Sequence, residues 1–135
     1  VLEPLSGYIT LAIALDQNRI LNGEAFNFGP PAYQNHSVGE LVDELTQHWP
    51  GSGWVDESNN TGFPPEAGLL KLNCDKALHA IGWRATLDFA ETARWTSDWY
   101  RTFYLEGAEA AQKTTSHQIE EYFKLAQARD SFRIG

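Results

Sequence analysis

Apolar residues recur at three- and four-residue spacing in several stretches of the chain, the pattern typical of amphipathic helices. The first stretch predicts a helix over residues 3–16, where Pro4 falls in the first turn and costs no hydrogen bond. Its apolar stripe consists of Leu5, Tyr8, Ile9, Ala12 and Leu15. The same spacing predicts further helices over residues 38–49, from about residue 75 to Ile81, over 88–105 and over 116–128.

Capping signals support several of these helix boundaries. Ser37 and Glu40 have the spacing of a capping box, which predicts the start of the helix at residue 38. Thr115 and Gln118 repeat that spacing before the last helix, so residues 108–114 are expected to be a link. Gly82 is expected to end the short third helix in a left-handed conformation.

Alternation of apolar and polar residues predicts a short strand at residues 24–29, stopped by Pro30 and Pro31. A second strand is predicted at Leu69–Leu72, and Trp54-Val55 is a possible third. Because helices separate them, these strands are expected to pair in parallel. The predicted fold class is therefore α/β, with roughly two or three short strands and about five helices in one small lobe over residues 1–135.

The charge of the chain limits its partners. The formal net charge is −8, and no Lys or Arg lies between Arg19 and Lys71. This argues against binding to nucleic acid or to an anionic membrane, and no apolar run is long enough for a membrane span. One cysteine, Cys74, cannot form an internal disulfide, which favours a reducing compartment and predicts a cytoplasmic protein.

Motifs for catalysis are missing from the chain. It contains no Gly-x-Gly-x-x-Gly turn for a dinucleotide and no Tyr-x-x-x-Lys pair for proton transfer. Asp75 and His79 could share a helix face, but no third metal ligand follows at a suitable spacing. Cys74 has no neighbouring base and is expected to be a small buried residue. We therefore predict no catalytic residue, cofactor site or metal site within residues 1–135.

The pattern that remains is one of ligand binding. Asn27 stands between two phenylalanines, and an asparagine so placed can hydrogen-bond a base or a sugar hydroxyl while the rings pack apolar faces. Trp54 and Glu66 bracket the long loop over residues 50–66, and long loops in compact domains are often functional. As a bare motif, the Asn27 pattern is explained better by ordinary packing of a strand than by ligand binding.

Three segments carry a resemblance to a known family. They are Val1-Leu-Glu-Pro-Leu-Ser-Gly-Tyr8, Gly23-Glu-Ala-Phe-Asn-Phe-Gly29, and Leu70-Lys-Leu-Asn-Cys-Asp-Lys-Ala77 with Ile81-Gly-Trp83. In this order they resemble the C-terminal region of CDP-glucose 4,6-dehydratases, which are NAD-dependent extended short-chain dehydrogenases. The first segment is the more specific signal, whereas Phe-Asn-Phe-Gly and Ile-Gly-Trp are shared by many extended short-chain enzymes.

The resemblance implies an enzyme of two parts with different functions. An N-terminal Rossmann domain, expected upstream of Val1, would hold NAD and the catalytic residues that oxidise C4, remove water across C5–C6 and return hydride to C6. This chain would be a fragment without catalytic activity of its own that closes over the nucleotide sugar, CDP-glucose. Asn27 is then the best candidate for a ligand contact, with Phe28, Trp54 and Glu66 as further candidates.

One departure from the family lies beside Glu66. Where the family tends to have histidine before Glu-Ala, this chain has Pro65, which offers no side-chain donor, so a polar ligand contact there is in doubt. Two alternatives also stay open: the same lobe of a sugar-nucleotide epimerase, and a stand-alone α/β module for protein contact. A lobe without its Rossmann partner exposes apolar surface, which predicts a homo-oligomer.

Overall fold

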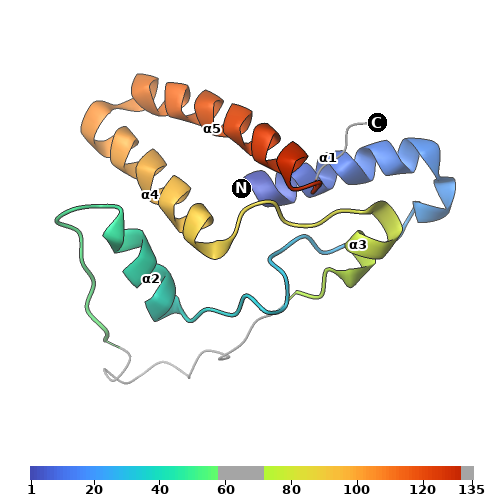
Figure 1. The fold of residues 1–135 in the computed structure, drawn as a ribbon, viewed down its shortest axis with the longest axis horizontal. Helices are drawn as coiled ribbons and strands as arrows, with labels where there is room; N and C mark the ends of the chain where they lie inside the picture. The colour runs from blue at the N-terminus through green and yellow to red at the C-terminus, as the bar shows by residue number, and fades with distance from the viewer. Residues whose placement is uncertain (58–71, 132–135) are drawn as a thin grey trace. The chain divides into compact units, whose positions relative to one another are not determined.

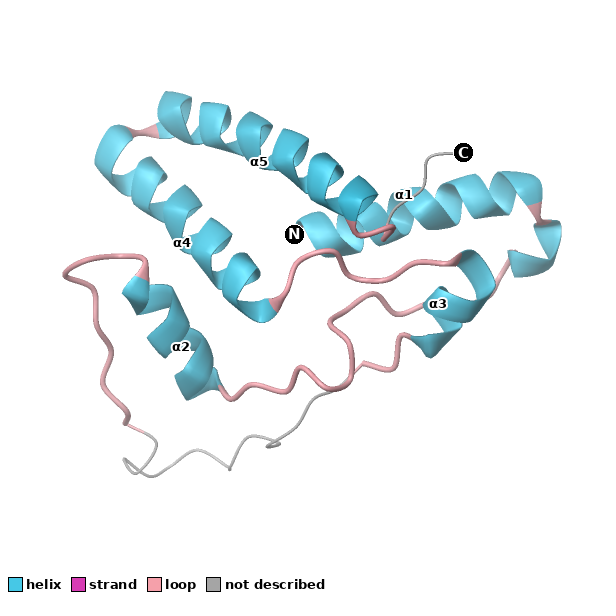
Figure 2. Ribbon diagram, viewed as in Figure 1, coloured by secondary structure: helices cyan, strands magenta, loops and turns pink. Residues whose placement is uncertain are grey.

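The computed structural model describes residues 1–57 and 72–131, and in these residues every regular element is a helix (Figures 1 and 2). The elements are α1 (Leu2–Gln17), the 3-10 helix η1 (Arg19–Leu21), α2 (Val38–Gln47), α3 (Asp75–Ile81), α4 (Phe89–Glu106) and α5 (Ala108–Ala128). The chain divides into two compact units. Unit 1 contains Val1–Gln34, Leu72–Asp88 and Ser116–Gly135, and unit 2 contains Asn35–Lys71 and Phe89–Thr115.

The predicted α/β fold class is wrong. Residues 24–29 and Trp54-Val55 have no regular secondary structure, and neither does Leu72, the one residue of the predicted strand Leu69–Leu72 that the structure describes. A strand needs a neighbouring strand that shares its backbone hydrogen bonds, whereas alternation of side chains specifies only which residues face the same way. No such neighbour is present among the described residues.

Unit 1 buries a face of α1 other than the predicted one. Ser6 and Gly7 are buried, while Leu5, Tyr8 and Ile9 of the predicted stripe are 46%, 60% and 47% exposed. A Cβ atom at Gly7 would overlap the ring of Phe28, so glycine is needed for this approach to the helix backbone. The helix prediction itself is confirmed.

The short helix α3 ends as its sequence predicts. Gly82 has φ +69°, in the left-handed region, and its N–H bonds the carbonyl of Leu78. The turn leads directly to Trp83, which is 1% exposed and is the largest fully buried side chain of the described residues. At the other end, the Asn73 Oδ1 accepts the Asp75 N–H at 2.9 Å.

The predicted capping box of α2, in unit 2, is confirmed. The Ser37 hydroxyl accepts the Glu40 N–H at 3.2 Å, and the Glu40 carboxylate accepts the Ser37 N–H at 2.6 Å. The backbone N–H of Ser37, with its hydroxyl, lowers the pKa of Glu40.

Unit 2 is held by packing between α2 and α4. The hydroxyl of Ser97, which is buried, donates to the carbonyl of Leu45 at 2.8 Å. The rings of Trp49 and Tyr104 lie 5.8 Å apart, so aromatic contact continues this interface beyond the end of α2.

The predicted link at residues 108–114 is wrong, because these residues are helical. Gly107, with φ +90°, separates α4 from α5 by itself. Thr115 is inside α5, where its hydroxyl bonds the carbonyl of Ala111 at 2.9 Å, so the capping box predicted with Gln118 does not start a helix. No helix of residues 1–57 or 72–131 is both long and apolar enough to cross a membrane.

Candidate functional site

Four aromatic rings of unit 1 meet around Phe28. The Phe28 ring lies edge-on to Trp83 at 5.0 Å and to Tyr8 at 5.6 Å, and it stacks on Phe26 at 6.5 Å. We call Tyr8, Phe26, Phe28 and Trp83 the aromatic cluster. With Gly7 against Phe28, it brings together residues from the three segments that resemble the dehydratase family.

A buried polar network lies beside this cluster. The Trp83 indole N–H donates to the Ser6 hydroxyl at 3.0 Å, and Ser6 in turn donates to the carbonyl of Glu3 at 2.7 Å. The Tyr122 hydroxyl lies 2.8 Å from the Ser6 oxygen and 3.0 Å from the Glu3 carboxylate, so its single proton is shared between two acceptors. Ser6, Trp83 and Tyr122 are 5%, 1% and 3% exposed.

The Glu3 carboxylate extends the network to the backbone that follows Trp83. It accepts the N–H of Thr86 at 3.0 Å and the N–H of Leu87 at 2.7 Å. Glu3, Ser6, Trp83, Thr86 and Tyr122 form what we call the Glu3 network. Within the described residues no buried side-chain polar atom lacks a hydrogen-bond partner, and a fully satisfied buried network favours a single arrangement of its members.

Burial controls the ionisation of Tyr122. It raises the pKa of the Tyr122 hydroxyl to about 12. Hydrogen bonds with Ser6 and Thr86 lower this pKa, and the charge of Glu3 raises it further. The phenol is therefore neutral and able to donate to Glu3 and Ser6 at physiological pH.

Asn27 is exposed and adjoins the aromatic cluster. Its side-chain amide nitrogen donates to the carbonyl of Asn73 at 3.2 Å, and this acceptor distinguishes the amide nitrogen from the oxygen. The amide oxygen has no partner among the described residues. Asn27 thus offers an acceptor to a ligand.

Lys76 is the one cation that contacts this segment in the described part of the chain, and sequence analysis did not single it out. Its ammonium lies 2.5 Å from the Glu24 carboxylate and 4.9 Å from the centroid of the Phe26 ring. The ion pair lowers the pKa of Glu24. Its signal in the sequence was its position within a segment that resembles the dehydratase family.

Trp54 belongs to a different compact unit from Asn27, and the structure does not describe Glu66. Trp54 belongs to unit 2, where its indole N–H donates to Asp43 at 2.9 Å and its ring lies beside Gly39. Trp54 is 43% exposed. Glu66 lies outside the described residues. Of the four predicted ligand-binding residues, Asn27 and Phe28 are the two that share a described segment.

Cys74, predicted to be a small buried residue, is half-buried. Burial raises the pKa of its thiol, which disfavours the thiolate needed for nucleophilic chemistry. In residues 1–57 and 72–131, no group of three or more His, Cys, Asp or Glu side chains could hold a metal ion.

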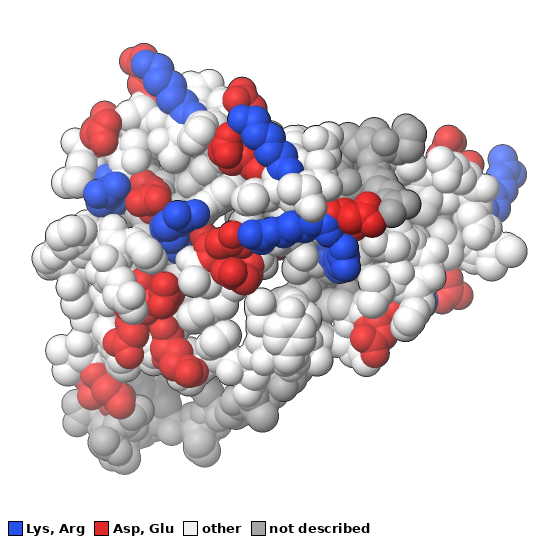
Figure 3. Space-filling model, viewed as in Figure 1, with Lys and Arg blue, Asp and Glu red and all other residues white. Residues whose placement is uncertain are grey.

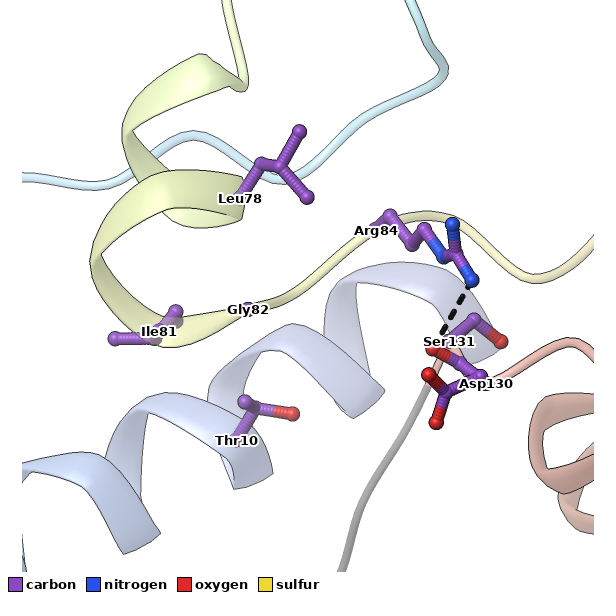
Figure 4. Close-up of a pocket in the computed structure, with 7 residues that line it drawn as sticks. All are labelled: Thr10, Leu78, Ile81, Gly82, Arg84, Asp130 and Ser131. Carbon is purple, nitrogen blue, oxygen red and sulfur yellow. Dashed lines mark hydrogen bonds between the residues drawn. The ribbon is translucent and has the colours of Figure 1, made fainter.

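A hollow of about 330 Å³ lies elsewhere in unit 1 (Figure 4). Its lining consists of Thr10, Leu78, Ile81, Gly82, Arg84, Asp130 and Ser131. The Arg84 guanidinium donates to the carbonyls of Arg129 at 2.5 Å and Asp130 at 3.2 Å, so this side chain caps the C-terminal end of α5. The hollow is therefore framed by a helix cap.

Acidic side chains gather over α2 on the face seen in Figure 3, in agreement with the cation-free stretch of the sequence. Glu40, Asp43 and Glu44 belong to this helix. An anionic ligand would not be attracted to it.

Comparison with known proteins identifies a related enzyme. Over 106 residues the chain is 36% identical to CDP-glucose 4,6-dehydratase of Salmonella typhimurium. The alignment covers 75% of this chain and 29% of that protein, so the chain spans less than a third of the length of its relative. No family model and no solved structure matches the chain. The sequence is thus related to a sugar-nucleotide dehydratase, as its motifs indicated.

Proposed function

We propose that this chain is the C-terminal, nucleotide-sugar-binding part of an NAD-dependent sugar-nucleotide 4,6-dehydratase, and that its ligand is CDP-glucose. The observation that carries the proposal is the 36% identity over 75% of the chain. The contacts among Gly7, Phe28 and Trp83 add support, because the residues behind the resemblance pack together in unit 1.

The residues of this chain do not fit an NAD site, because they include no glycine-rich turn after a strand. We assign the cofactor and the catalytic groups to a part of the protein outside residues 1–135. The proposed contribution of this chain is to bind and orient the nucleotide sugar, without catalysis of its own.

Asn27 is proposed as the main ligand contact. The Asn73 carbonyl fixes the amide of Asn27, so its exposed oxygen is presented in a defined orientation. The exposed part of the Phe28 ring adds apolar contact, and Lys76 is the adjacent positive charge. Trp54 and Glu66 stay in the proposal as predicted contacts from the loop over residues 50–66.

Titration calorimetry tests the binding function. The complete gene product is expected to bind CDP-glucose more tightly than UDP-glucose, and Asn27→Ala is expected to weaken CDP-glucose binding about five-fold, which corresponds to loss of one hydrogen bond of about 1 kcal/mol. Asn22→Ala, which changes another exposed asparagine, is the matched control. Equal affinity for both nucleotide sugars would contradict the assignment of CDP-glucose.

An enzyme assay tests the reaction separately from binding. The complete gene product, supplied with NAD, is expected to convert CDP-glucose to its 4-keto-6-deoxy derivative. Inversion of configuration at one sugar carbon without loss of water would instead identify a sugar-nucleotide epimerase.

Self-association is the second candidate function, favoured by one observation. Leu5, Tyr8 and Ile9 are exposed on one side of α1. We propose that a second copy of the chain covers this side, since exposed apolar surface is stabilised by burial. A homo-oligomer is compatible with both candidates, whereas an assembly indifferent to nucleotides favours a module for protein contact.

A further inference from the structure

We propose that Ser6 is a positioning residue for the ligand contact at Asn27, acting through Trp83 and Phe28. The inference rests on the proposed function, because it concerns how the nucleotide sugar is held. It adds a buried residue of α1 that neither the sequence motifs nor the related enzyme's name assigns to ligand binding.

The segment that carries Asn27 depends on side chains for its position. Residues 25–29 make no backbone–backbone hydrogen bond to another described residue. Side-chain contacts hold them instead: the Asn27 amide on the Asn73 carbonyl, the Phe28 ring on α1 and Trp83, and the Gly29 backbone on the Cys74 thiol. A displacement of Phe28 is therefore transmitted directly to its neighbour Asn27.

The Phe28 ring is confined on two sides. On one side the ring lies against Gly7, where even one added carbon would overlap it. Trp83 meets it edge-on, with the ring planes at 81° and the centroids 5.0 Å apart. Aromatic pairs in this geometry depend on the orientation of both rings, so the rotation of Trp83 sets the position of Phe28.

Ser6 fixes that rotation. Its hydroxyl accepts the Trp83 indole N–H at 3.0 Å and the Tyr122 hydroxyl at 2.8 Å, and it donates to the carbonyl of Glu3 at 2.7 Å. All the hydrogen-bonding capacity of one serine is thereby used. Without this oxygen, the buried indole N–H loses the acceptor that sets the rotation of Trp83.

The test compares Ser6→Ala with Thr10→Val in the complete gene product. Thr10 lies one turn further along α1, and its hydroxyl donates to the backbone carbonyl of Ser6, so Thr10→Val removes a hydroxyl that bonds no side chain of the Glu3 network. Two properties are measured: the NMR resonances of the Asn27 side-chain amide without ligand, and the affinity for CDP-glucose.

We expect Ser6→Ala to shift the Asn27 amide resonances and to weaken CDP-glucose binding about five-fold, the equivalent of one hydrogen bond of about 1 kcal/mol. Thr10→Val is expected to change neither. Unshifted Asn27 resonances in a folded Ser6→Ala protein whose Trp83 indole resonance has moved would overturn the inference, since the network would then be purely structural.

The two measurements separate failure of the inference from failure of the proposed function. If the wild-type protein does not bind CDP-glucose, the proposed function fails, and the Asn27 resonances still decide whether Ser6 positions this residue. If Ser6→Ala does not fold, Ser6→Cys replaces it. Sulfur is a weak acceptor, so the same shift is expected in a smaller size, and its absence overturns the inference.

Discussion

The indole N–H of Trp83 donates to the hydroxyl of Ser6 at 3.0 Å, although the two residues are 77 positions apart in the sequence. This bond joins α1 to the turn after α3, and both side chains are buried. Two of the segments that resemble the related enzyme family therefore contact each other. One ends in Ser-Gly-Tyr8 and the other ends in Gly-Trp83.

Gly7→Ala is expected to destabilise unit 1. The added carbon would overlap the Phe28 ring, and overpacking of a tightly packed site costs about 1–3 kcal/mol. Urea unfolding measured by circular dichroism checks this. The control is Gly39→Ala in α2, where the new Cβ would lie 3.5 Å from the Trp54 ring, an ordinary contact, so its stability should not fall. Equal effects of both changes would contradict the close approach of Phe28 to Gly7.

Alkaline pH is expected to destabilise the protein through Tyr122. The pKa of this phenol is raised from 10.0 to about 12 in the folded protein, so the neutral form is favoured by folding. The resulting stabilisation is fully present below pH 10 and is lost as pH rises through about 12. The free energy of unfolding, measured by urea titration across this range, should decrease less in Tyr122→Phe than in the wild-type protein.

Tyr104→Phe is the control for that experiment. Tyr104 is 67% exposed, so Tyr104→Phe removes a phenol hydroxyl outside the buried network, and the alkaline loss of stability through Tyr122 should persist in this variant. A wild-type profile that is flat through the alkaline range would show that Tyr122 is not protected by burial.

Ser37→Ala is expected to destabilise α2. Loss of a serine N-cap costs about 1 kcal/mol, because the N–H groups of the first helical turn lose an acceptor. Thermal unfolding checks the change against Ser52→Ala, which removes a hydroxyl that bonds only the carbonyl of Trp49. If both variants unfold alike, the cap contributes nothing measurable.

The chain is expected to self-associate through α1. Light scattering should give a mass above the 15.1 kDa of one chain, and Ile9→Lys should reduce it by placing a charge on the exposed apolar side. Ile20→Lys changes an isoleucine that is 85% exposed in η1, outside that side, and should leave the mass unaltered. A wild-type mass of one chain would refute self-association.

Local signals predicted the helices well. The Ser37 and Glu40 capping box and the left-handed Gly82 act within a few residues, so the sequence alone specifies them. The same reasoning failed at Thr115, whose capping-box spacing with Gln118 occurs inside a helix. The true boundary is Gly107, which interrupts the helical path by its own positive φ.

Long-range relationships were not predictable in the same way. The spacing of Leu5, Tyr8 and Ile9 gives an apolar stripe, but the buried side of α1 is decided by Gly7 and Ser6, whose partners Phe28 and Trp83 come from distant segments. The strand predicted at residues 24–29 failed for a related reason. Alternating side chains do not specify a partner for the backbone, and aromatic packing holds the segment instead.

The Glu3 network also has a consequence for how the protein folds during translation. Glu3 and Tyr122 are 119 positions apart, so the network cannot close until α5 has been synthesised. Contacts of such long range form slowly, because the entropy of a large loop must be lost first. Unit 2 joins Leu45 to Ser97 over 52 positions and can complete this contact earlier. On the ribosome, α1 is therefore made before α5 and is secured only after α5 has been synthesised.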